Sequence, residues 1–302
     1  MSRKPTVAAD LRSAGFRGGI REELPLAPLT TWKIGGPAEL LAEPADVDDL
    51  GLAVEWALER GLPWRNLGNG SNLLVRDSGV RGMVVRIRKC LDEIEFDNET
   101  VVAGAGAMFP VVARLAASKG LAGIEFGAGI PGTIGGAIVM NAGWHEFEIG
   151  NVVHRVHHLS PQGVRSEISA PDCVFRYRGS AFRGRPGIVL ATELALTPGR
   201  ADEITARLEA FAASRKENQP TELPSCGSVF LKPPGDFAGR LIEAAGLKGH
   251  RVGAIEVSPQ HANFFVNRGG GTAAQVLELV EHVEAVVKDR FDVSLTREFE
   301  FW

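Results

Sequence analysis

Residues 127–143 read GAGIPGTIGGAIVMNAG, the densest run of glycine in a chain that contains 36 glycines. Gly127, Gly129 and Gly132 match the G-x-G-x-x-G spacing of dinucleotide-binding folds. Pro131, however, occupies the position where the crossover helix of such a fold would begin, and no acidic residue closes a clear second strand about 20 residues later. We therefore interpret this segment as a loop that brings backbone amides against a large flat or phosphorylated ligand.

A second glycine-rich segment, GNGSN at residues 68–72, follows a short predicted strand at 64–67. Glycine permits positive φ angles, so consecutive N–H groups there can face one anion. Ser71 and Asn72 add side-chain donors, and the arrangement suits a pyrophosphate. Either glycine-rich segment alone could be a tight turn and nothing more, but two of them, both flanked by strands, favour a dinucleotide-type ligand.

The overall charge excludes some partners. The 302 residues carry 33 basic and 37 acidic side chains, so the net charge is -4 and no global basic field exists to bind nucleic acid or an anionic membrane. No stretch approaches the ~20 apolar residues of a membrane span, and the N-terminus lacks a signal peptide's apolar run. Three widely spaced cysteines suit a reducing compartment. We expect a cytoplasmic protein with no obligate protein partner.

Hydrophobic periodicity predicts an α+β fold, not a regular βαβ series. Asp46 can cap a helix that stops at Gly61-Leu62-Pro63. We expect helices over 47–60, 109–119, 201–216, 237–245 and 272–290, and strands over 64–67, 80–87, 91–96, 100–103, 152–159, 164–168, 188–196, 262–267 and 293–301. The length suits two domains; we place them at 29–198 and 199–302, after a loosely structured N-terminal extension over residues 1–28.

Arginine, serine and cysteine side chains are candidates for chemistry. Arg176 and Arg178 lie among aromatic residues, where an arginine can bind a carboxylate with a bidentate fork; the alternative is a surface arginine along a strand. Ser228 follows a glycine-containing turn, and its hydroxyl could approach a substrate, although no G-x-S-x-G elbow surrounds it. Cys226 has no evident adjacent base, and we interpret it as a small buried packing residue.

Histidines and the C-terminal glutamates are further candidates. His154, His157 and His158 form H-x-x-H-H in a segment that alternates like a strand, with no C-x-x-C or H-E-x-x-H partner, so we expect surface histidines and no metal site. His261, at a strand entrance, could line a site or cap a turn. In the last predicted strand, alternation places Glu298 and Glu300 on one face, with Phe299 and Phe301 on the other. One carboxylate could reach a site; a solvated edge strand is the alternative.

Taken together and in order, several motifs resemble one family over nearly the whole chain, from about Thr30 to Glu298. The motifs are TTWKIGG (30–36), LGNGSNLLV (67–75), the 127–143 segment ending MNAG, FRYR (175–178), SCGSVF (225–230) and SPQHANF (258–264). They resemble the UDP-N-acetylenolpyruvoylglucosamine reductase family. The resemblance implies an FAD-binding domain of the vanillyl-alcohol-oxidase (PCMH) type and a smaller α+β substrate domain. It also implies reduction of the enolpyruvyl ether of a UDP-sugar by NADPH through non-covalent FAD, in peptidoglycan precursor synthesis.

The resemblance also implies residue roles. Arg178 would be the catalytic arginine, Ser228 the proton donor and Glu298 the acidic partner. Ser71 and Asn72 would hold the FAD pyrophosphate, together with Gly68, Asn69 and Gly70; the flavin would lie along Gly127, Gly129, Ile130, Pro131, Gly132, Gly135, Gly136, Asn141, Ala142 and Gly143. The family usually has a proline before the glutamate where this chain has Arg297, which leaves Glu298 and Glu300 both open. Because Tyr177 is the only tyrosine, the chain resembles the shorter branch, which lacks a tyrosine-bearing loop.

Two other functions remain open from the sequence. A flavin oxidase or dehydrogenase of an alcohol or sugar could share the fold, and many such enzymes tether FAD covalently through a histidine. No histidine precedes His145, which excludes that tether at the first glycine segment. A non-enzymatic protein that binds flavin or a nucleotide sugar is the other alternative, and it would consume no NADPH.

Overall fold

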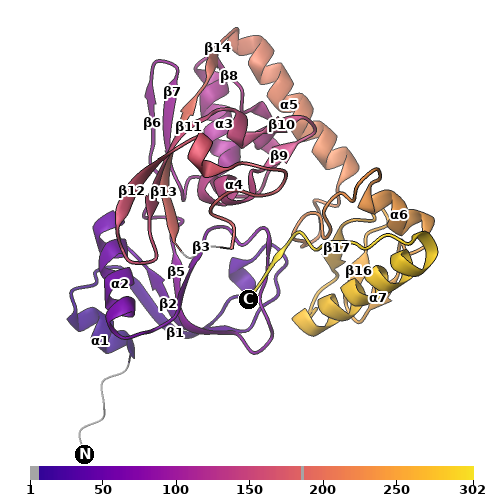
Figure 1. Cartoon of the computed structure of the whole chain (residues 1–302), viewed down its shortest axis with the longest axis horizontal. Helices are drawn as coiled ribbons and strands as arrows, with labels where there is room; N and C mark the ends of the chain where they lie inside the picture. Colours follow the sequence, from indigo (N-terminus) through magenta and orange to yellow (C-terminus); the bar gives the residue numbers. More distant parts are fainter. Residues whose placement is uncertain (1–6, 185–186) are drawn as a thin grey trace, which may run out of the picture. The chain divides into compact units, whose positions relative to one another are not determined.

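The structure is a computed structural model that describes residues 7–184 and 187–302 (Figure 1). The chain divides into two compact units, each with its own hydrophobic core. The first unit contains the described residues up to Leu24, with Ala38–Asn69 and Arg81–Ala213; the second contains Pro25–Pro37, Gly70–Val80 and Ser214–Trp302. Two short segments thus fold with the C-terminal third, which a single division near residue 198 does not anticipate.

The N-terminal segment is built into the first unit, contrary to the expectation of a loosely structured extension. Leu11 in helix α1 (Val7–Ser13) is fully buried, and Phe16 is 1% exposed. Strand β1 then enters a four-stranded sheet of order β1-β2-β5-β3, whose β3 and β5 are parallel. The strands are β1 (Gly19–Pro25), β2 (Pro37–Glu43), β3 (Trp64–Leu67) and β5 (Val80–Arg86), and a 3-10 turn η1 (Ala27–Leu29) follows β1.

Helix α2 (Val47–Glu59) begins where the sequence predicts. The Asp46 carboxylate accepts hydrogen bonds from the N–H groups of Asp48 and Asp49 at 3.1 and 2.9 Å, which is the N-cap role. Arg17 pairs with the same carboxylate at 2.6 Å. The hydrogen bond from the Asp49 amide and then the one from Arg17 hold the pKa of Asp46 below its usual range.

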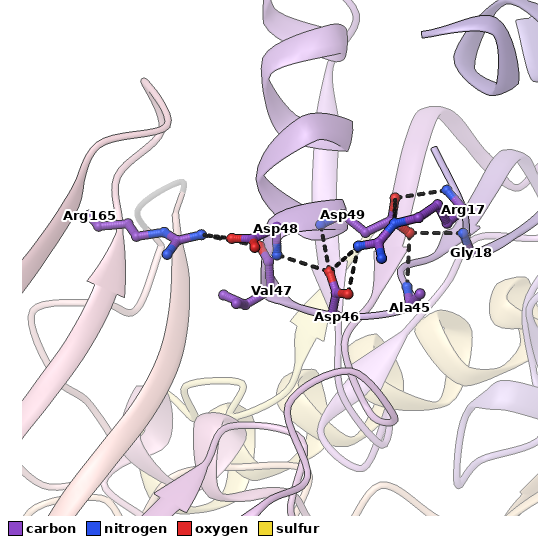
Figure 2. Close-up of polar contacts among 8 residues, drawn as sticks. All are labelled: Arg17, Gly18, Ala45, Asp46, Val47, Asp48, Asp49 and Arg165. Carbon is purple, nitrogen blue, oxygen red and sulfur yellow. Dashed lines mark hydrogen bonds and ion pairs between the residues drawn. The ribbon is translucent and has the colours of Figure 1, made fainter. Parts of the chain in front are cut away.

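The Asp49 side chain fastens the N-terminal segment to this helix (Figure 2). It is 2% exposed, and its carboxylate accepts from the N–H groups of Arg17 and Gly18, both at 2.8 Å, and of Ala45 at 2.9 Å. A carboxylate removed from water is stable when donors fill its lone pairs in this way. Gly18 cannot be larger, because a Cβ there would lie 2.0 Å from the Glu43 carbonyl oxygen.

A five-stranded antiparallel sheet of order β12-β11-β13-β7-β6 completes the first unit. The hairpin predicted on either side of residues 160–163 is present, and helix α4 packs against β13 and β7 (Figure 1). The main elements are β6 (Ile94–Asp97), β7 (Thr100–Gly104), α3 (Phe109–Ser118), α4 (Ile134–Met140), β11 (Val153–Leu159), β12 (Arg165–Ser169) and β13 (Ile188–Ala195). Short pairs join β8 (Leu121–Ala122) to β14 (Thr197–Pro198) and β9 (Gly143–Trp144) to β10 (Phe147–Glu148), with 3-10 turns η2 (Glu125–Gly129), η3 (Ile149–Asn151) and η4 (Pro171–Cys173).

The second unit is a small α+β domain. Its sheet has the order β15-β16-β17, and helices α6 and α7 pack on each other beside it. Trp32 anchors residues 25–37 in this core: the ring is fully buried, and its Nε1 donates to the Phe265 carbonyl at 2.9 Å. The elements are α6 (Ala238–Ala244), β15 (Arg251–Val252), β16 (Ile255–Val257), β17 (Phe265–Asn267) and α7 (Ala273–Phe291); α5 (Ala201–Asn218) crosses the division between the units. No helix in the described ranges is long and apolar enough to cross a bilayer.

Two predicted elements differ from the structure. The final strand is confined to β18 (Glu300–Phe301), which pairs in parallel with β4 (Leu73–Leu74), so simple alternation fails: Phe299 is 6% exposed and Phe301 is 41% exposed. The segment 127–143 contains helix α4, although it was expected to be a loop. Helix α4 forms despite its two glycines because Thr133 caps it and because its apolar side chains, such as Ile138, are buried.

Replacing Asp49 should destabilise the protein. Asp49→Ala leaves three N–H donors without their carboxylate, and we expect the free energy of unfolding to fall by about 2–4 kcal/mol. Urea unfolding measures this loss. Asp48→Asn is the matched control, because that neighbouring side chain is 82% exposed and pairs only with an exposed arginine, and it should unfold near the wild-type midpoint. Equal midpoints for the two variants would contradict the anchoring role.

Candidate functional site

The first glycine-rich segment, residues 68–72, leaves the end of β3 in a conformation that requires glycine. Gly70 has φ +60°, and a Cβ there would lie 2.7 Å from the Leu29 carbonyl oxygen. The Gly70 carbonyl accepts a hydrogen bond from the Thr31 amide at 3.1 Å. A Cβ on Gly68 would lie 2.8 Å from Thr133 Oγ1. Both glycines are therefore needed to let the backbone turn this closely against its neighbours.

The backbone amides of this segment are available for a ligand. In the part of the chain that the structure describes, the N–H groups of Gly68, Asn69, Gly70 and Ser71 donate to no protein acceptor, and none of these residues is fully exposed. The side chains of Asn69 and Asn72, predicted to face a ligand, donate hydrogen bonds within the protein. Asn69 Nδ2 donates to the Pro131 carbonyl at 2.5 Å, and Asn72 Nδ2 donates to the Glu298 carbonyl at 3.3 Å. The segment thus offers main-chain donors more than asparagine side chains.

The second glycine-rich segment, residues 127–143, uses its amides differently. Nine of its N–H groups donate to acceptors within the first unit at 2.8–3.3 Å; they belong to Gly127, Ile130, Gly132, Ile134, Gly135, Gly136, Ala137, Asn141 and Ala142. These groups are therefore not free to bind a ligand, contrary to the idea that this loop works through its amides. What the segment presents is a surface shaped by η2, the turn at Pro131 and helix α4.

Glycine occupies the positions of this second segment for different reasons. A Cβ on Gly127 would lie 2.5 Å from the Phe109 ring, and one on Gly135 would lie 2.8 Å from Ala105 Cβ, so these two glycines serve packing. Gly136 differs: it is exposed within α4, and a Cβ would meet only Thr133 Oγ1, at 3.6 Å. Glycine inside a helix costs about 0.5–1 kcal/mol relative to alanine. The surface at Gly136 is therefore open, and no contact within the protein requires glycine there.

Arg178 lies at the tip of a two-residue turn in the first unit. Arg176 and Gly179 exchange two backbone hydrogen bonds, both at 3.0 Å, which leaves Tyr177 and Arg178 between them. Arg178 has φ +51° and is half-buried, whereas Arg176 is exposed. Arg178 Nη2 donates to the Gly143 carbonyl at 3.0 Å. Of the two candidate arginines, Arg178 is thus the one held in place.

Ser228 and Glu298 lie on adjacent segments of the second unit. Ser228 forms a β-bridge with Phe264, and the next residue, Val229, accepts the Glu298 amide at 2.8 Å. Burial, and next the charge of Glu298, raise the pKa of Cys226 well above its usual value, so Glu298 also lies near this thiol. The amide of Glu300, which begins β18, instead donates to the Asn72 carbonyl. This places Glu298, more than Glu300, beside the segment that carries Ser228.

Asn263 and His261 support that segment, and the sequence assigned no role to Asn263. Asn263 is 7% exposed; its Oδ1 accepts from the Phe230 amide at 3.0 Å and its Nδ2 donates to the Phe230 carbonyl at 2.8 Å. The side chain therefore pairs with the backbone of Phe230 as another backbone segment would. His261 Nδ1 accepts from the Asn263 amide at 3.2 Å, which is the turn-capping role left open by the sequence. Burial lowers the pKa of His261.

The other three candidate histidines, His154, His157 and His158, lie on β11 of the five-stranded sheet. His157 Nε2 is 2.9 Å from Glu193 Oε1, and His154 is exposed. His158 is half-buried, and burial lowers its pKa. Among the described residues, no group of three histidine, cysteine or acidic side chains could hold a metal ion.

Comparisons with known proteins agree with this architecture. Residues 38–166 match the family model described as an FAD binding domain, and residues 219–302 match the C-terminal domain of UDP-N-acetylenolpyruvoylglucosamine reductase. The UDP-N-acetylenolpyruvoylglucosamine reductase of Rubrobacter xylanophilus is 48% identical over 91% of this chain and 92% of its own length. That of Moorella thermoacetica is 43% identical over 98% of both chains.

A solved structure extends the comparison to three dimensions. The UDP-N-acetylenolpyruvylglucosamine reductase of Thermus caldophilus has a TM-score of 0.81 and 36% identity, covering 95% of this chain and 99% of that one. The expected α+β fold, an FAD-binding domain with a smaller C-terminal domain, is therefore confirmed.

The cysteines should behave as packing residues in the native protein. Burial raises the pKa of Cys90 to about 12 and that of Cys173 to about 11, and the pKa of Cys226 is also raised. Because only the thiolate reacts readily, raised pKa values lower reactivity near pH 8. We expect Ellman's reagent to modify the native thiols far more slowly than the same three thiols in denaturant. A native thiol that reacts as fast as a free peptide cysteine would contradict this assignment.

Proposed function

The chain belongs to the family of UDP-N-acetylenolpyruvoylglucosamine reductases, and we propose that it catalyses the reaction for which that family is named. It reduces the enolpyruvyl ether of UDP-N-acetylglucosamine enolpyruvate to UDP-N-acetylmuramate, with NADPH as reductant and non-covalent FAD as carrier. The observation that carries the proposal is the row of N–H groups over residues 68–71 that have no acceptor among the described residues, in a chain matched to an FAD-binding domain over residues 38–166.

The residues present fit FAD. A pyrophosphate carries two negative charges, and consecutive N–H groups from Gly68 to Ser71 can bind it without adding a cation to a chain of net charge -4. The open surface at Gly136 suits the flat isoalloxazine ring, because any side chain there would occupy the space that the ring needs. Gly127 and Gly135 allow the segment to pack closely against Phe109 and Ala105.

FAD held by the N–H groups of residues 68–71 would carry a hydride from NADPH to the methylene carbon of the enol ether. Negative charge then develops on the adjacent carbon and spreads into its carboxylate. Arg178 faces this carboxylate and stabilises the charge where it develops. The turn that fixes Arg178 makes the guanidinium available without reorganisation, which is the condition for a large electrostatic contribution.

Ser228 delivers the proton that completes the reaction. Its Oγ–H bond breaks as the proton moves to the carbanion-like carbon, and the serine then regains a proton from water. A hydroxyl is a weak acid in water, but such a carbon is a strong base, so a fixed serine can serve. Glu298, held beside this segment by its bond to Val229, is the acidic partner in this step. The net reaction consumes one NADPH and one proton.

The cellular setting follows from the substrate. UDP-sugars and NADPH are cytoplasmic metabolites, and we place the enzyme in the cytoplasm, acting alone on a peptidoglycan precursor. No nucleic-acid or membrane partner is part of the proposal, consistent with the nearly balanced charge.

Gly136→Ala tests the flavin surface. Alanine favours the helix, so we expect the flavin-free protein to gain up to about 1 kcal/mol of stability, while the dissociation constant of FAD rises by about tenfold or more. Fluorescence titration with FAD measures the second effect. Gly51→Ala in α2 is the matched control, since a Cβ there would meet nothing within 4 Å; it should leave FAD affinity unchanged. Wild-type FAD affinity in Gly136→Ala would show that the flavin lies elsewhere.

The two half-reactions of the wild-type protein test the proposed function. The purified wild-type protein should be yellow; anaerobic NADPH should bleach it, and the enolpyruvyl sugar nucleotide should restore the colour. Failure of the last step in the wild type would refute the proposed reaction. Acid precipitation should release the yellow cofactor into solution, because the flavin is not covalently attached.

In Ser228→Ala we expect flavin reduction by NADPH within about twofold of wild type, and reoxidation by substrate slowed by about 10²–10⁴-fold, the usual contribution of a positioned acid. Stopped-flow absorbance follows both steps. Ser225→Ala, in the same loop, serves as control and should leave both rates close to wild type. If both half-reactions of Ser228→Ala match wild type, the serine is not the donor.

A further inference from the structure

The Asn141 side chain is committed entirely to the protein. It is 1% exposed; its Nδ2 donates to Glu148 Oε2 at 2.7 Å and to the Arg176 carbonyl at 3.1 Å, and its Oδ1 accepts from the Gly150 amide at 3.0 Å. A Cβ on Gly150 would lie 2.8 Å from the same Oδ1, so the chain approaches closely there. Both amide N–H bonds and the amide oxygen are therefore in use, which leaves only the backbone of Asn141 for contact with a cofactor.

The carbonyl that Asn141 binds is the one that closes the turn carrying Arg178. The Arg176 carbonyl also accepts the Gly179 amide at 3.0 Å, which completes the turn. Arg178, at the tip, has φ +51°, a conformation that residues other than glycine adopt only rarely. Such a conformation persists only where the surroundings hold it. The second hydrogen bond, from Asn141, is one such restraint, beside the bond that Arg183 Nη1 donates to the Arg178 carbonyl at 2.7 Å.

Asn141 also sets the position of the acceptor for the guanidinium. Arg178 Nη2 donates to the Gly143 carbonyl, and Gly143 lies two residues after Asn141. Asn141 itself has φ +44° and ψ +57°, a left-handed conformation that ends helix α4 and turns the chain toward Gly143. The backbone of Arg178 and the end of its side chain are thus both held relative to this one asparagine.

We propose that Asn141 is a positioning residue for Arg178. The inference rests on the proposed function, in which Arg178 stabilises charge on the substrate carboxylate. Asn141 touches no reacting atom and acts through the Arg176–Gly179 turn. A displacement of the guanidinium by about 1 Å, from a substitution at a residue that takes no part in the chemistry, can cost about 10²-fold in rate.

A double-mutant cycle on the complete FAD-loaded enzyme tests this. Glycine adopts the left-handed conformation freely, so Asn141→Gly removes the three hydrogen bonds without adding backbone strain. We expect it to slow reoxidation of the flavin by the enolpyruvyl substrate by about 10- to 100-fold, with FAD content and reduction by NADPH near wild type. Arg178→Ala alone should cost about 10²–10³-fold. In the Arg178→Ala background, Asn141→Gly should cost less than about twofold more, because its effect passes through Arg178.

A second readout does not depend on turnover. Amide hydrogen exchange at Gly150 and Gly179 should be faster in Asn141→Gly, since both amides lose restraint. Asn98→Gly is the matched control: Asn98 also has a positive φ, +50°, but is exposed in the β6–β7 turn, and it should change neither exchange at these glycines nor either half-reaction. If the fold-reductions in reoxidation rate of the two single variants multiply in the double variant, the proposal is overturned. That result would show that Asn141 acts independently of Arg178.

If Asn141→Gly fails to fold, Asn141→Asp replaces it in the same cycle. Aspartate keeps the acceptor for Gly150 and tolerates the left-handed conformation, but it has no N–H donor for the Arg176 carbonyl. Glu148→Gln is combined with it, so that no second carboxylate faces the new one, and the same non-additive result is expected. The two proposals fail differently. If the wild-type enzyme is not reoxidised by the enolpyruvyl sugar nucleotide, the proposed function is refuted. If the wild type turns over normally but the fold-reductions in rate of the two variants multiply, only the role of Asn141 is refuted.

Discussion

Backbone N–H groups need acceptors, and this requirement organises the rest of the structure. A half-buried donor without a protein partner depends on water or a ligand, and a donor that loses both costs about 1–3 kcal/mol. The protein satisfies nearly all such groups in residues 127–143 internally, yet leaves a row of them unpaired over residues 68–71. The two glycine-rich segments, which look alike as sequence, therefore differ in structure: one leaves backbone donors for a ligand, and the other pairs its donors within the protein.

The same contrast explains why glycine recurs for several physical reasons. Gly70 is required by its positive φ and by a neighbouring carbonyl, Gly127 by an aromatic ring, and Gly136 by nothing in the protein itself. At Gly136, in a helix where alanine would be more stable, the backbone leaves room for a flat ring such as that of the proposed cofactor. Only the structure distinguishes these causes, because each is set by atoms distant in sequence.

Local patterns predicted the elements whose determinants are themselves local. Helix α2 with its Asp46 cap and the β11–β12 hairpin lie within a residue or two of the expected bounds. Helix α4 was missed because its stability comes from burial and from the Thr133 cap, which outweigh two unfavourable glycines. The last strand was overextended because its pairing with Leu73–Leu74 covers only two residues, whatever the alternation upstream suggests.

The candidate site shows a similar limit: sequence motifs pointed to candidate reactive side chains, but not to the groups that hold them. Asparagine amides do that work here, with Asn72 on the Glu298 carbonyl, Asn141 on the Arg176 carbonyl and Asn263 on both polar groups of Phe230. A neutral amide can donate and accept at once, so it fixes a backbone segment without introducing a charge. A lysine or glutamate in the same place would add its own field to the arginine and carboxylate that the chemistry needs. Neutral support therefore lets the charged groups act on the substrate undiminished, which is a reason for a site of this kind to be built on asparagine.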